Sequence, residues 1–517
     1  MKTDKNELTL TIPVILSGLI LGLCFPPFAS TYAVLLLLLP FIHSIYLMPE
    51  RSAKFGFLFG FSMSVTALYW IFSNAGADAL WIKIVSGFGM FVVNATFYSI
   101  FGLLYKASHK IFRDKAIWTV PLLWGGMEHL MQWEEFAFPW TLLAHLFTGK
   151  TKFIQIAEFT GAISVSMLMI FISVILYLGI KYFSEKKYFS ASVTVQCAIF
   201  ITIGLVLFGH FRMDHFNSDT EKMPSIKATM IHPSLEIEEK WKSENFNNIV
   251  NTQFALSGQS LNENPDLIIW GESNFPKYLE NNPSFMRDFI LYSANKKVDL
   301  CIGSLGYDYF PNTETFNKYN SVFFFDQNNN ISRYDKRKLV PFGERFPLSQ
   351  YLTFLEEISL GQANFDKGTN TKPFVMTNGH KFSSNVCYEG VFPYYNAMLV
   401  RNGSEFIVNV SNDAWYECSK QIYQHSRFTV FRAIENRRSI IRLANKAENS
   451  VFLPSGEQKI LFDHAGSLYK VVDVPMNNKL TFFTRYGYWF ARLTILLNSA
   501  ILLLALIMFA KDKTGKK

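Results

Sequence analysis

Apolar residues dominate the first 210 positions of the chain and occur there in seven successive runs. Each run approaches the roughly 20 residues that a helix needs to cross a bilayer. The runs begin near Leu8, Tyr32, Phe55, Ile82, Ile117, Ala162 and Ser190. The pattern predicts seven membrane-spanning helices. The fifth run also fits a buried or re-entrant segment, because Glu128 and Glu134 crowd its end.

From about Asn217 the pattern changes, because the chain turns polar and then alternates short apolar runs with turn-forming or helix-forming stretches. Runs of this length and composition are typical of buried strands. Their sequences are ATMIHP, DLIIW, VDLCIGS, NSVFFFD, FSSNVC and EFIVNVS. Strands that alternate with helical segments predict an α/β domain, and the QNNN stretch at 327–330 predicts a hairpin turn within it.

Apolar character returns near Thr481 and continues to about Phe509, which is long enough for one further crossing. The fold class expected is therefore a membrane helical bundle of about eight transmembrane helices plus an inserted α/β domain. We expect three parts: a transmembrane bundle at 1–216, a catalytic domain at 217–484, and a last transmembrane helix with a basic tail at 485–517.

Lysine and arginine follow every second predicted span, which gives an orientation. They cluster at 51–54, 106–115 and 181–187, whereas the loops after the first and third spans are nearly free of them. Short cytoplasmic loops carry an excess of Lys and Arg. Both termini are therefore expected in the cytoplasm and the α/β domain on the outer face.

Composition excludes several classes of function. Half of the 517 residues are hydrophobic and only 17% are charged, which is too apolar for one soluble domain. The formal charge of +8 is scattered between apolar runs, so no nucleic-acid partner is expected. Five cysteines without a CxxC pair or His/Cys ligand spacing predict neither a metal site nor a disulfide framework, and no cofactor is implied.

Three reactive side chains stand just beyond predicted strands, where open α/β sheets usually hold their sites. They are Glu272, Lys336 and Cys387. A cysteine is a strong nucleophile, but near neutral pH only a few per cent of a free thiol is ionised, so it needs a base and a positive neighbour. Glu272 can take the proton, and Lys336 can stabilise both the thiolate and the oxyanion formed when it attacks a carbonyl. A Cys/His arrangement with His425 remains open.

Several longer motifs carry a resemblance to known proteins. They are WGES at 270–273, YDKRKLVPFGERFP at 334–347, CYEGVFP at 387–393, SNDAWY at 411–416, QH at 424–425 and RAIENRRSIIR at 432–442, with LCFPPF and FPWTLLAH in the membrane part. The chain resembles the nitrilase-like carbon–nitrogen hydrolases, and more narrowly their membrane-embedded branch, the apolipoprotein N-acyltransferases. The resemblance covers most of the chain and implies an αββα sandwich for the α/β domain.

The resemblance assigns roles residue by residue. It implies Glu272 as general base, Lys336 as oxyanion-stabilising cation and Cys387 as nucleophile. The supporting or substrate-binding residues that it implies are Trp241, Asn320, Glu344, Tyr388 and Glu389. For Glu344 an ion pair that holds Lys336 is the alternative role.

The implied reaction moves an acyl chain from a membrane phospholipid, through a Cys387 thioester, to the α-amine of a diacylglyceryl-cysteine at an apolipoprotein N-terminus. A helical anchor on such a domain itself argues for a lipid substrate. The implied setting is a bacterial inner membrane with the catalytic domain periplasmic and the protein a monomer. A membrane-anchored hydrolase or amidase with the same triad, and a non-catalytic lipid-binding module, remain as alternatives.

Three positions depart from the pattern of the family: Gly271, Ile231–Pro233 and Ala444–Ala447. The last lacks a glycine, and a turn that needs a positive φ tolerates alanine poorly. These departures concern the substrate rim and not the reactive residues. The stretch Pro347–Phe365 has apolar residues at helical spacing and is interpreted either as a mobile lid or as a helix packed on the domain.

Overall fold

The computed structural model describes residues 2–28, 31–77, 79–312, 314–347, 349, 351, 364–416, 419–462 and 466–514. By its internal contacts the chain forms two compact units. The helical unit comprises residues 1–72, 83–212 and 486–517, and the sheet unit comprises 73–82 and 213–485. Most of the lid or helix expected at Pro347–Phe365 lies outside the described residues.

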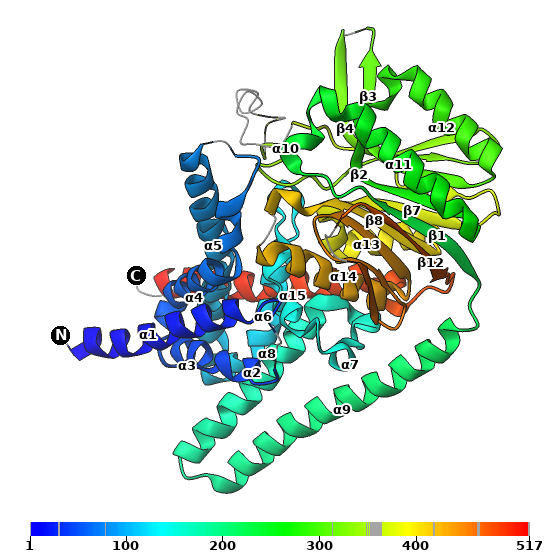
Figure 1. Cartoon of the computed structure of the whole chain (residues 1–517). Coiled ribbons are helices and arrows are strands. Elements are labelled where there is room, and N and C mark those ends of the chain that lie inside the picture. Colours follow the sequence, from blue (N-terminus) through cyan, green and yellow to red (C-terminus); the bar gives the residue numbers. More distant parts are fainter. Residues whose placement is uncertain are drawn as a thin grey trace. The chain divides into compact units, whose positions relative to one another are not determined.

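The helical unit is built from long and short helices (Figure 1). They are α1 (Lys2–Leu23), α2 (Val34–Leu37), α3 (Leu39–Leu47), α4 (Ser52–Ala67), α5 (Leu80–Phe112), α6 (Val120–Leu130), α7 (Thr151–Ile154), α8 (Ala157–Ser184), α9 (Tyr188–Thr220) and α15 (Phe482–Thr514). The long helices α5, α9 and α15 each continue for some residues into the sheet unit.

The count of about eight spans is not confirmed. Among the described residues, four helical segments are long and apolar enough to cross a membrane: Leu80–Leu130, Ala157–Ser184, Tyr188–Thr220 and Phe482–Lys511. The second and third predicted runs instead form a pair bent by 112°, which counts as a fifth span only if taken together. The fourth and fifth runs merge into one helical stretch, and the first run yields only a shorter apolar helix, Glu7–Leu23.

The charged end of the fifth run has a structural explanation. Glu128 is buried, and its Oε1 accepts hydrogen bonds from Trp124 Nε1 at 2.9 Å and from the backbone N–H of Leu143 at 2.8 Å. Leu143 begins an irregular buried segment, where backbone groups need internal partners because no water serves them. Glu128 therefore stabilises the FPWTLLAH stretch, which forms the short 3-10 helices Pro139–Thr141 and Leu143–Phe147 in place of a continuous α-helix.

The sheet unit contains two six-stranded sheets. The first has the order β12-β1-β2-β3-β4-β5 and the second β11-β10-β9-β8-β7-β6. The first sheet consists of β1 (Ser225–His232), β2 (Leu267–Tyr278), β3 (Asp299–Phe310), β4 (Thr315–Phe325), β5 (Ile331–Asp335) and β12 (Leu468–Pro475). The second consists of β6 (Phe374–Val375), β7 (Lys381–Val386), β8 (Phe406–Asn412), β9 (Ser439–Asn445), β10 (Asn449–Phe452) and β11 (Gln458–Phe462).

Parallel strands form the centre of each sheet, and helices cover the outer faces. In the first sheet β1, β2 and β3 run parallel, and in the second β7, β8 and β9 do. The covering helices are α11 (Phe246–Ser260) and α12 (Pro283–Lys296) on the first sheet, and α13 (Pro393–Arg401) and α14 (Lys420–Asn436) on the second (Figure 1). The ring of Phe324 in β4 packs on Phe374 and Phe382 of the second sheet. The predicted α/β fold is thus confirmed, and all six strand-like runs are strands.

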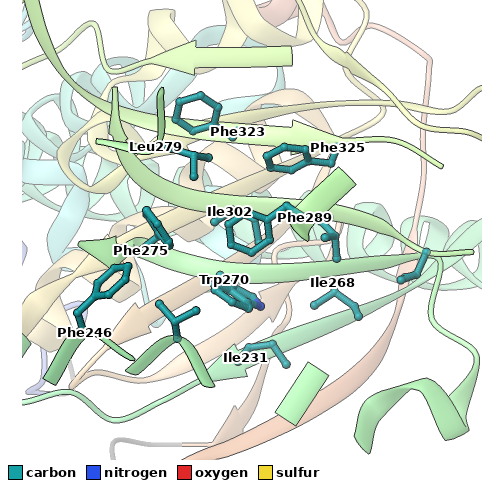
Figure 2. Close-up of a cluster of buried hydrophobic side chains, with 13 residues drawn as sticks. Ile231, Phe246, Ile268, Trp270, Phe275, Leu279, Phe289, Ile302, Phe323 and Phe325 are labelled. Carbon is teal, nitrogen blue, oxygen red and sulfur yellow. The ribbon is translucent and has the colours of Figure 1, made fainter. Parts of the chain in front are cut away.

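An aromatic core fixes β2 against its helices (Figure 2). Trp270 is buried and packs edge-on against Phe254 of α11 and Phe289 of α12, with ring centroids 5.1 and 5.2 Å apart. Its Nε1 also donates to Ser257 Oγ at 3.0 Å. Burial of such a side chain contributes about 1.5–3 kcal/mol. The anchor lies two residues before Glu272 and therefore sets the position of the strand that carries it.

The ladder between β2 and β3 becomes irregular just after this anchor. Regular parallel pairing runs from Leu267 to Trp270, and the next partner pair, Phe275 with Ser304, follows a register shift. In a regular strand, successive side chains point to opposite faces of the sheet. A break of this kind changes the direction in which the local side chains point. Glu272 lies within the break.

We expect Gly303→Ala in β3 to destabilise the sheet unit by about 1–3 kcal/mol, the usual cost of overpacking. A Cβ at Gly303 would lie 2.1 Å from the carbonyl oxygen of Gly271 and 2.9 Å from the Cα of Glu272. Gly258→Ala is the matched control, because a Cβ there meets nothing within 4 Å on helix α11. Thermal unfolding of the full chain in detergent checks this, and equal midpoints for the two variants would contradict it.

Candidate active site

The strand ends bring the three reactive residues of the sequence into one electrostatic environment within the sheet unit. Glu272 lies in β2 of the first sheet, and Lys336 directly follows β5 at the edge of that sheet. Cys387 directly follows β7 of the second sheet. The charges of Glu272 and Lys336 both act on the pKa of the Cys387 thiol, in opposite directions.

Lys336 is fully buried and ion-paired. Its Nζ donates to Glu344 Oε1 at 2.8 Å, and Glu344 Oε2 accepts from the backbone N–H of Val340 at 2.9 Å. Burial by itself would lower the pKa of Lys336, but Glu344, Cys387 and Glu272 outweigh burial and raise it. The amine is therefore a permanent cation, and the ion-pair role considered for Glu344 matches the geometry.

Glu272 has the environment of a general base. The side chain is buried, and Asn320 Nδ2 donates to its Oε1 at 2.7 Å. Its Oε2 has no hydrogen-bond partner within the part of the chain that the structure describes. Burial raises the pKa of Glu272, while Lys336 opposes this effect. A carboxylate with one unoccupied oxygen and a raised pKa is suited to accept a proton.

Cys387 begins the 3-10 turn Cys387–Val391 in a left-handed conformation, with φ 51°. This region costs a residue with a Cβ about 1–3 kcal/mol and persists only where the surroundings fix it. Burial, and next the charge of Glu272, raise the pKa of the thiol, whereas Lys336 lowers it. The resting sulfur is thus a protonated thiol that needs a base before it can attack.

Glu389 ties the nucleophile's turn to the segment that carries Lys336. Its Oε2 accepts from the backbone N–H of Val386 at 2.8 Å and from the Tyr334 hydroxyl at 2.5 Å. Its Oε1 accepts from the backbone N–H groups of Arg337 and Lys338 at 2.7 and 3.0 Å. One carboxylate therefore holds together the two segments that bear the nucleophile and the cation.

A second buried network holds the carbonyl oxygen of Cys387. Asn409 Nδ2 donates to it at 3.2 Å, and His425 Nε2 lies 3.2 Å from it. Arg442 contacts Asn409 Oδ1 at 2.6 Å and also pairs with Asp413, whose Oδ1 lies 2.9 Å from His425 Nδ1. Asn409 directly, and His425 through Asp413, are therefore both linked to Arg442, and the network stabilises the left-handed turn.

Sequence reasoning missed Asn409, Asp413 and Arg442 as site residues, although a signal was present. Asn409 and Arg442 are polar residues inside the apolar strands β8 and β9, where a buried side chain needs a partner. His425 lies between two partners, with its Nε2 3.2 Å from the carbonyl oxygen of Cys387 and its Nδ1 2.9 Å from Asp413 Oδ1. These contacts give His425 a structural role in the turn.

Ligand atoms of Cys387, Asp413 and His425 lie within 4.8 Å of one another, a spacing that also suits a metal ion. The guanidinium of Arg442 already neutralises Asp413, however, and both ring nitrogens of His425 have protein partners. The chemistry of the cluster is therefore that of a hydrogen-bond network and does not fit a cation.

The remaining predicted residues differ in exposure. Trp241 follows the short helix α10 (Ile237–Lys240) and is 43% exposed. Tyr388 is buried and packs edge-on against Phe392, with ring centroids 5.0 Å apart. Tyr388 thus supports the turn by packing, whereas Trp241 is available at the surface.

Two of the three segments that depart from the family pattern are linked, because residues just after 231–233 are joined to 444–447 by hydrogen bonds and an ion pair. Asn445 in 444–447 hydrogen-bonds both the N–H and the C=O of Leu235, just after 231–233, at 3.0 and 2.7 Å. Lys446 pairs with Glu236. The left-handed residue of this turn is Lys446, with φ 59°. The residue with the unfavourable positive φ is therefore Lys446 and not Ala447, and the ion pair with Glu236 helps to hold Lys446 in this conformation.

Comparison with known proteins gives two family matches. Residues 17–175 match the apolipoprotein N-acyltransferase N-terminal domain, and residues 246–467 match the carbon–nitrogen hydrolase family. Proteins named apolipoprotein N-acyltransferase from Geobacter metallireducens and Rickettsia prowazekii are each 27% identical. The matches cover 92% and 93% of this chain, and 91% and 95% of the relatives. An amidase of the nitrilase superfamily from Nesterenkonia AN1 aligns over 49% of this chain and 93% of its own, with 14% identity and a TM-score of 0.36.

We expect Glu389→Gln to lower the stability of the sheet unit by about 1–3 kcal/mol, because an amide NH₂ in place of either oxygen would face two of the four donors. Alkylation of Cys387 should change as well, since the turn is no longer held. Glu457→Gln at an exposed position is the control. Thermal midpoints and alkylation rates are the measurements, and two variants that behave alike would show that Glu389 does not hold the turn.

Proposed function

Because this chain belongs to the apolipoprotein N-acyltransferase family, we propose that it takes an acyl group from a membrane phospholipid and carries it as a thioester on Cys387. The protein is an acyltransferase of lipoprotein maturation and a membrane protein. The observation that supports the thioester is the arrangement around Cys387: a held left-handed thiol, a carboxylate with an unoccupied oxygen, and a permanent cation.

In the first half-reaction Glu272 takes the proton of the Cys387 thiol, and the thiolate attacks the ester carbonyl carbon of the phospholipid. The carbonyl electron pair moves to oxygen, where the Lys336 ammonium stabilises the oxyanion. The intermediate collapses and expels the lysophospholipid alkoxide, which takes the proton from Glu272. The acyl chain remains on Sγ as a thioester.

In the second half-reaction the α-amine of a diacylglyceryl-cysteine at an apolipoprotein N-terminus attacks the thioester carbonyl. Glu272 takes a proton from the amine, and the oxyanion again faces Lys336. Collapse expels the Cys387 thiolate, which recovers the proton from Glu272, and an amide is released. Both halves pass through the same kind of oxyanion, so one base and one cation serve both.

The supporting residues act in this scheme through contacts already described. Glu344 keeps Lys336 charged, Asn320 orients Glu272, and Glu389 holds the nucleophile's turn against the Lys336 segment. Loss of one oxyanion donor typically costs about 3 kcal/mol of transition-state stabilisation. Tyr388 acts by packing, and the exposed Trp241 is proposed as a substrate contact at the rim.

We also propose the setting that the lysine and arginine pattern supports. The sheet unit lies on the periplasmic side of a bacterial inner membrane, both termini lie in the cytoplasm, and the protein acts as a monomer. Glu272, Lys336 and Cys387 all come from one chain and one unit, so the reaction needs no second copy. The clusters of Lys and Arg at 51–54, 106–115 and 181–187 in the sequence support the orientation.

Intact mass of the full chain after incubation with phospholipid tests the proposal. Wild type should gain one acyl mass that hydroxylamine removes, and should lose it to a diacylated lipopeptide as an amide. Cys387→Ser should form no hydroxylamine-sensitive adduct, because an ester of serine is less labile than a thioester. An adduct lost only to water would assign a lipid hydrolase with the same triad, and no adduct on folded wild type would refute the thioester.

A further inference from the structure

Lys240 is a buried cation that the mechanism above does not use. It ends helix α10, and its side chain is fully buried. Its Nζ donates to the backbone carbonyl oxygen of Glu272 at 2.8 Å. A buried lysine is costly unless its charge has a function or a partner. The partner here is the backbone of the proposed general base.

The segment that carries Lys240 is fixed at two points. At its start Asn445 binds the backbone of Leu235, and Lys446 pairs with Glu236. At its end Lys240 binds Glu272 O, and the Trp241 ring lies 5.5 Å from the Lys240 Nζ. We call residues 234–241 the strap. The strap therefore connects the rim residue Trp241 directly to the strand break that holds Glu272.

We propose that Lys240 is a positioning residue of the acyl transfer: it fixes the backbone of Glu272 and adds a second positive charge, besides that of Lys336, next to the proposed general base. The inference rests on the proposed role of Glu272. It goes further by coupling the base to the strap and to the exposed Trp241.

The charges that face Glu272 balance only when Lys240 is included. Lys336 comes from the end of β5, Glu344 from the loop after it, Lys240 from the strap and Cys387 from the second sheet. Glu272 and Glu344 bring two negative charges, and Lys336 and Lys240 bring two positive ones. When the thiol proton moves to Glu272, the thiolate replaces the carboxylate and the sum is unchanged. Among these four groups, loss of Lys240 leaves one negative charge uncompensated.

The sign of the effect on pH dependence follows from these neighbours. Burial and Glu344 raise the pKa of Glu272, whereas Lys336 and Lys240 lower it. Removal of Lys240 should therefore raise the pKa of Glu272 further, so that the base is protonated and inactive up to a higher pH. Burial in turn lowers the pKa of Lys240 to about 8, so the amine carries its charge at neutral pH.

The test compares Lys240→Met with Lys242→Met in the full chain in detergent. Lys242 is two residues away, half exposed, and pairs with Glu239 at the surface. The readouts are acyl transfer from phospholipid vesicles to a diacylated lipopeptide and the rate of Cys387 alkylation by iodoacetamide, both from about pH 5 to 9, the range in which these groups titrate.

Lys240→Met should shift the acid limb of both profiles upward by about one pH unit, which is about a tenfold lower rate at fixed pH on that limb. It should lower kcat and leave the KM for phospholipid within about twofold, because the effect is on the base and not on binding. Lys242→Met should match wild type. Lys240→Gln keeps a donor without the charge, and decides the question if the Met variant fails to fold.

An acid limb that stays in place in a folded Lys240 variant would overturn the inference. Glu272→Gln separates this outcome from failure of the proposed function. If the alkylation profile depends on Glu272 but not on Lys240, only the role of Lys240 is wrong. If the profile is indifferent to Glu272 as well, the general-base role of Glu272 is itself wrong.

Discussion

The ion pair between Lys336 and Glu344 is the interaction on which the site depends. A lone buried ammonium would lose its proton or draw in water, because desolvation of a charge costs several kcal/mol. Glu344, anchored by the backbone of Val340, removes that option and leaves Lys336 charged at the edge of the first sheet. With a fixed cation in place, Cys387 can rest as a neutral thiol, since thiolate and oxyanion both form beside a positive charge. Glu272 can likewise keep one oxygen that has no hydrogen-bond partner among the described residues.

Local departures from regular secondary structure place the reactive groups of this site. β2 pairs regularly up to the aromatic anchor Trp270 and then loses register, which allows Glu272 to leave the alternation of the strand. Cys387 adopts a left-handed conformation that Glu389 holds from one side and the Arg442 network from the other. The regular sheets and their helices supply the rigidity, and the irregular points supply the reactive groups.

Most of the α/β architecture follows from short-range patterns. Six apolar runs of strand length become strands, and the Asn-rich turn at 327–330 closes the β4–β5 hairpin, where Asp326 accepts from the backbone of Asn328 and Asn330. Glu272, Lys336 and Cys387 stand out because each follows a strand-like apolar run in the sequence, although Glu272 lies within the longer strand β2 of the structure. Lys240 does not stand out, because its importance arises from a contact with a distant segment, and on the sequence it looks like a surface charge. Arg442 is conspicuous as a charge inside an apolar strand, but its partners also come from distant segments. Counting spans from apolar runs fails where a run is short, bent or merged with its neighbour, because hydrophobicity alone does not define where a helix ends.

The contact between Asn445 and Leu235 joins two turns that lie more than 200 positions apart in the chain. Each turn looks like an isolated oddity when it is compared with relatives one position at a time. In the folded protein each supplies what the other lacks, because Asn445 satisfies the backbone of Leu235 and Glu236 neutralises Lys446. A substitution in one turn therefore removes a partner of the other, and an engineer who wishes to reshape the rim has to transplant them as one piece.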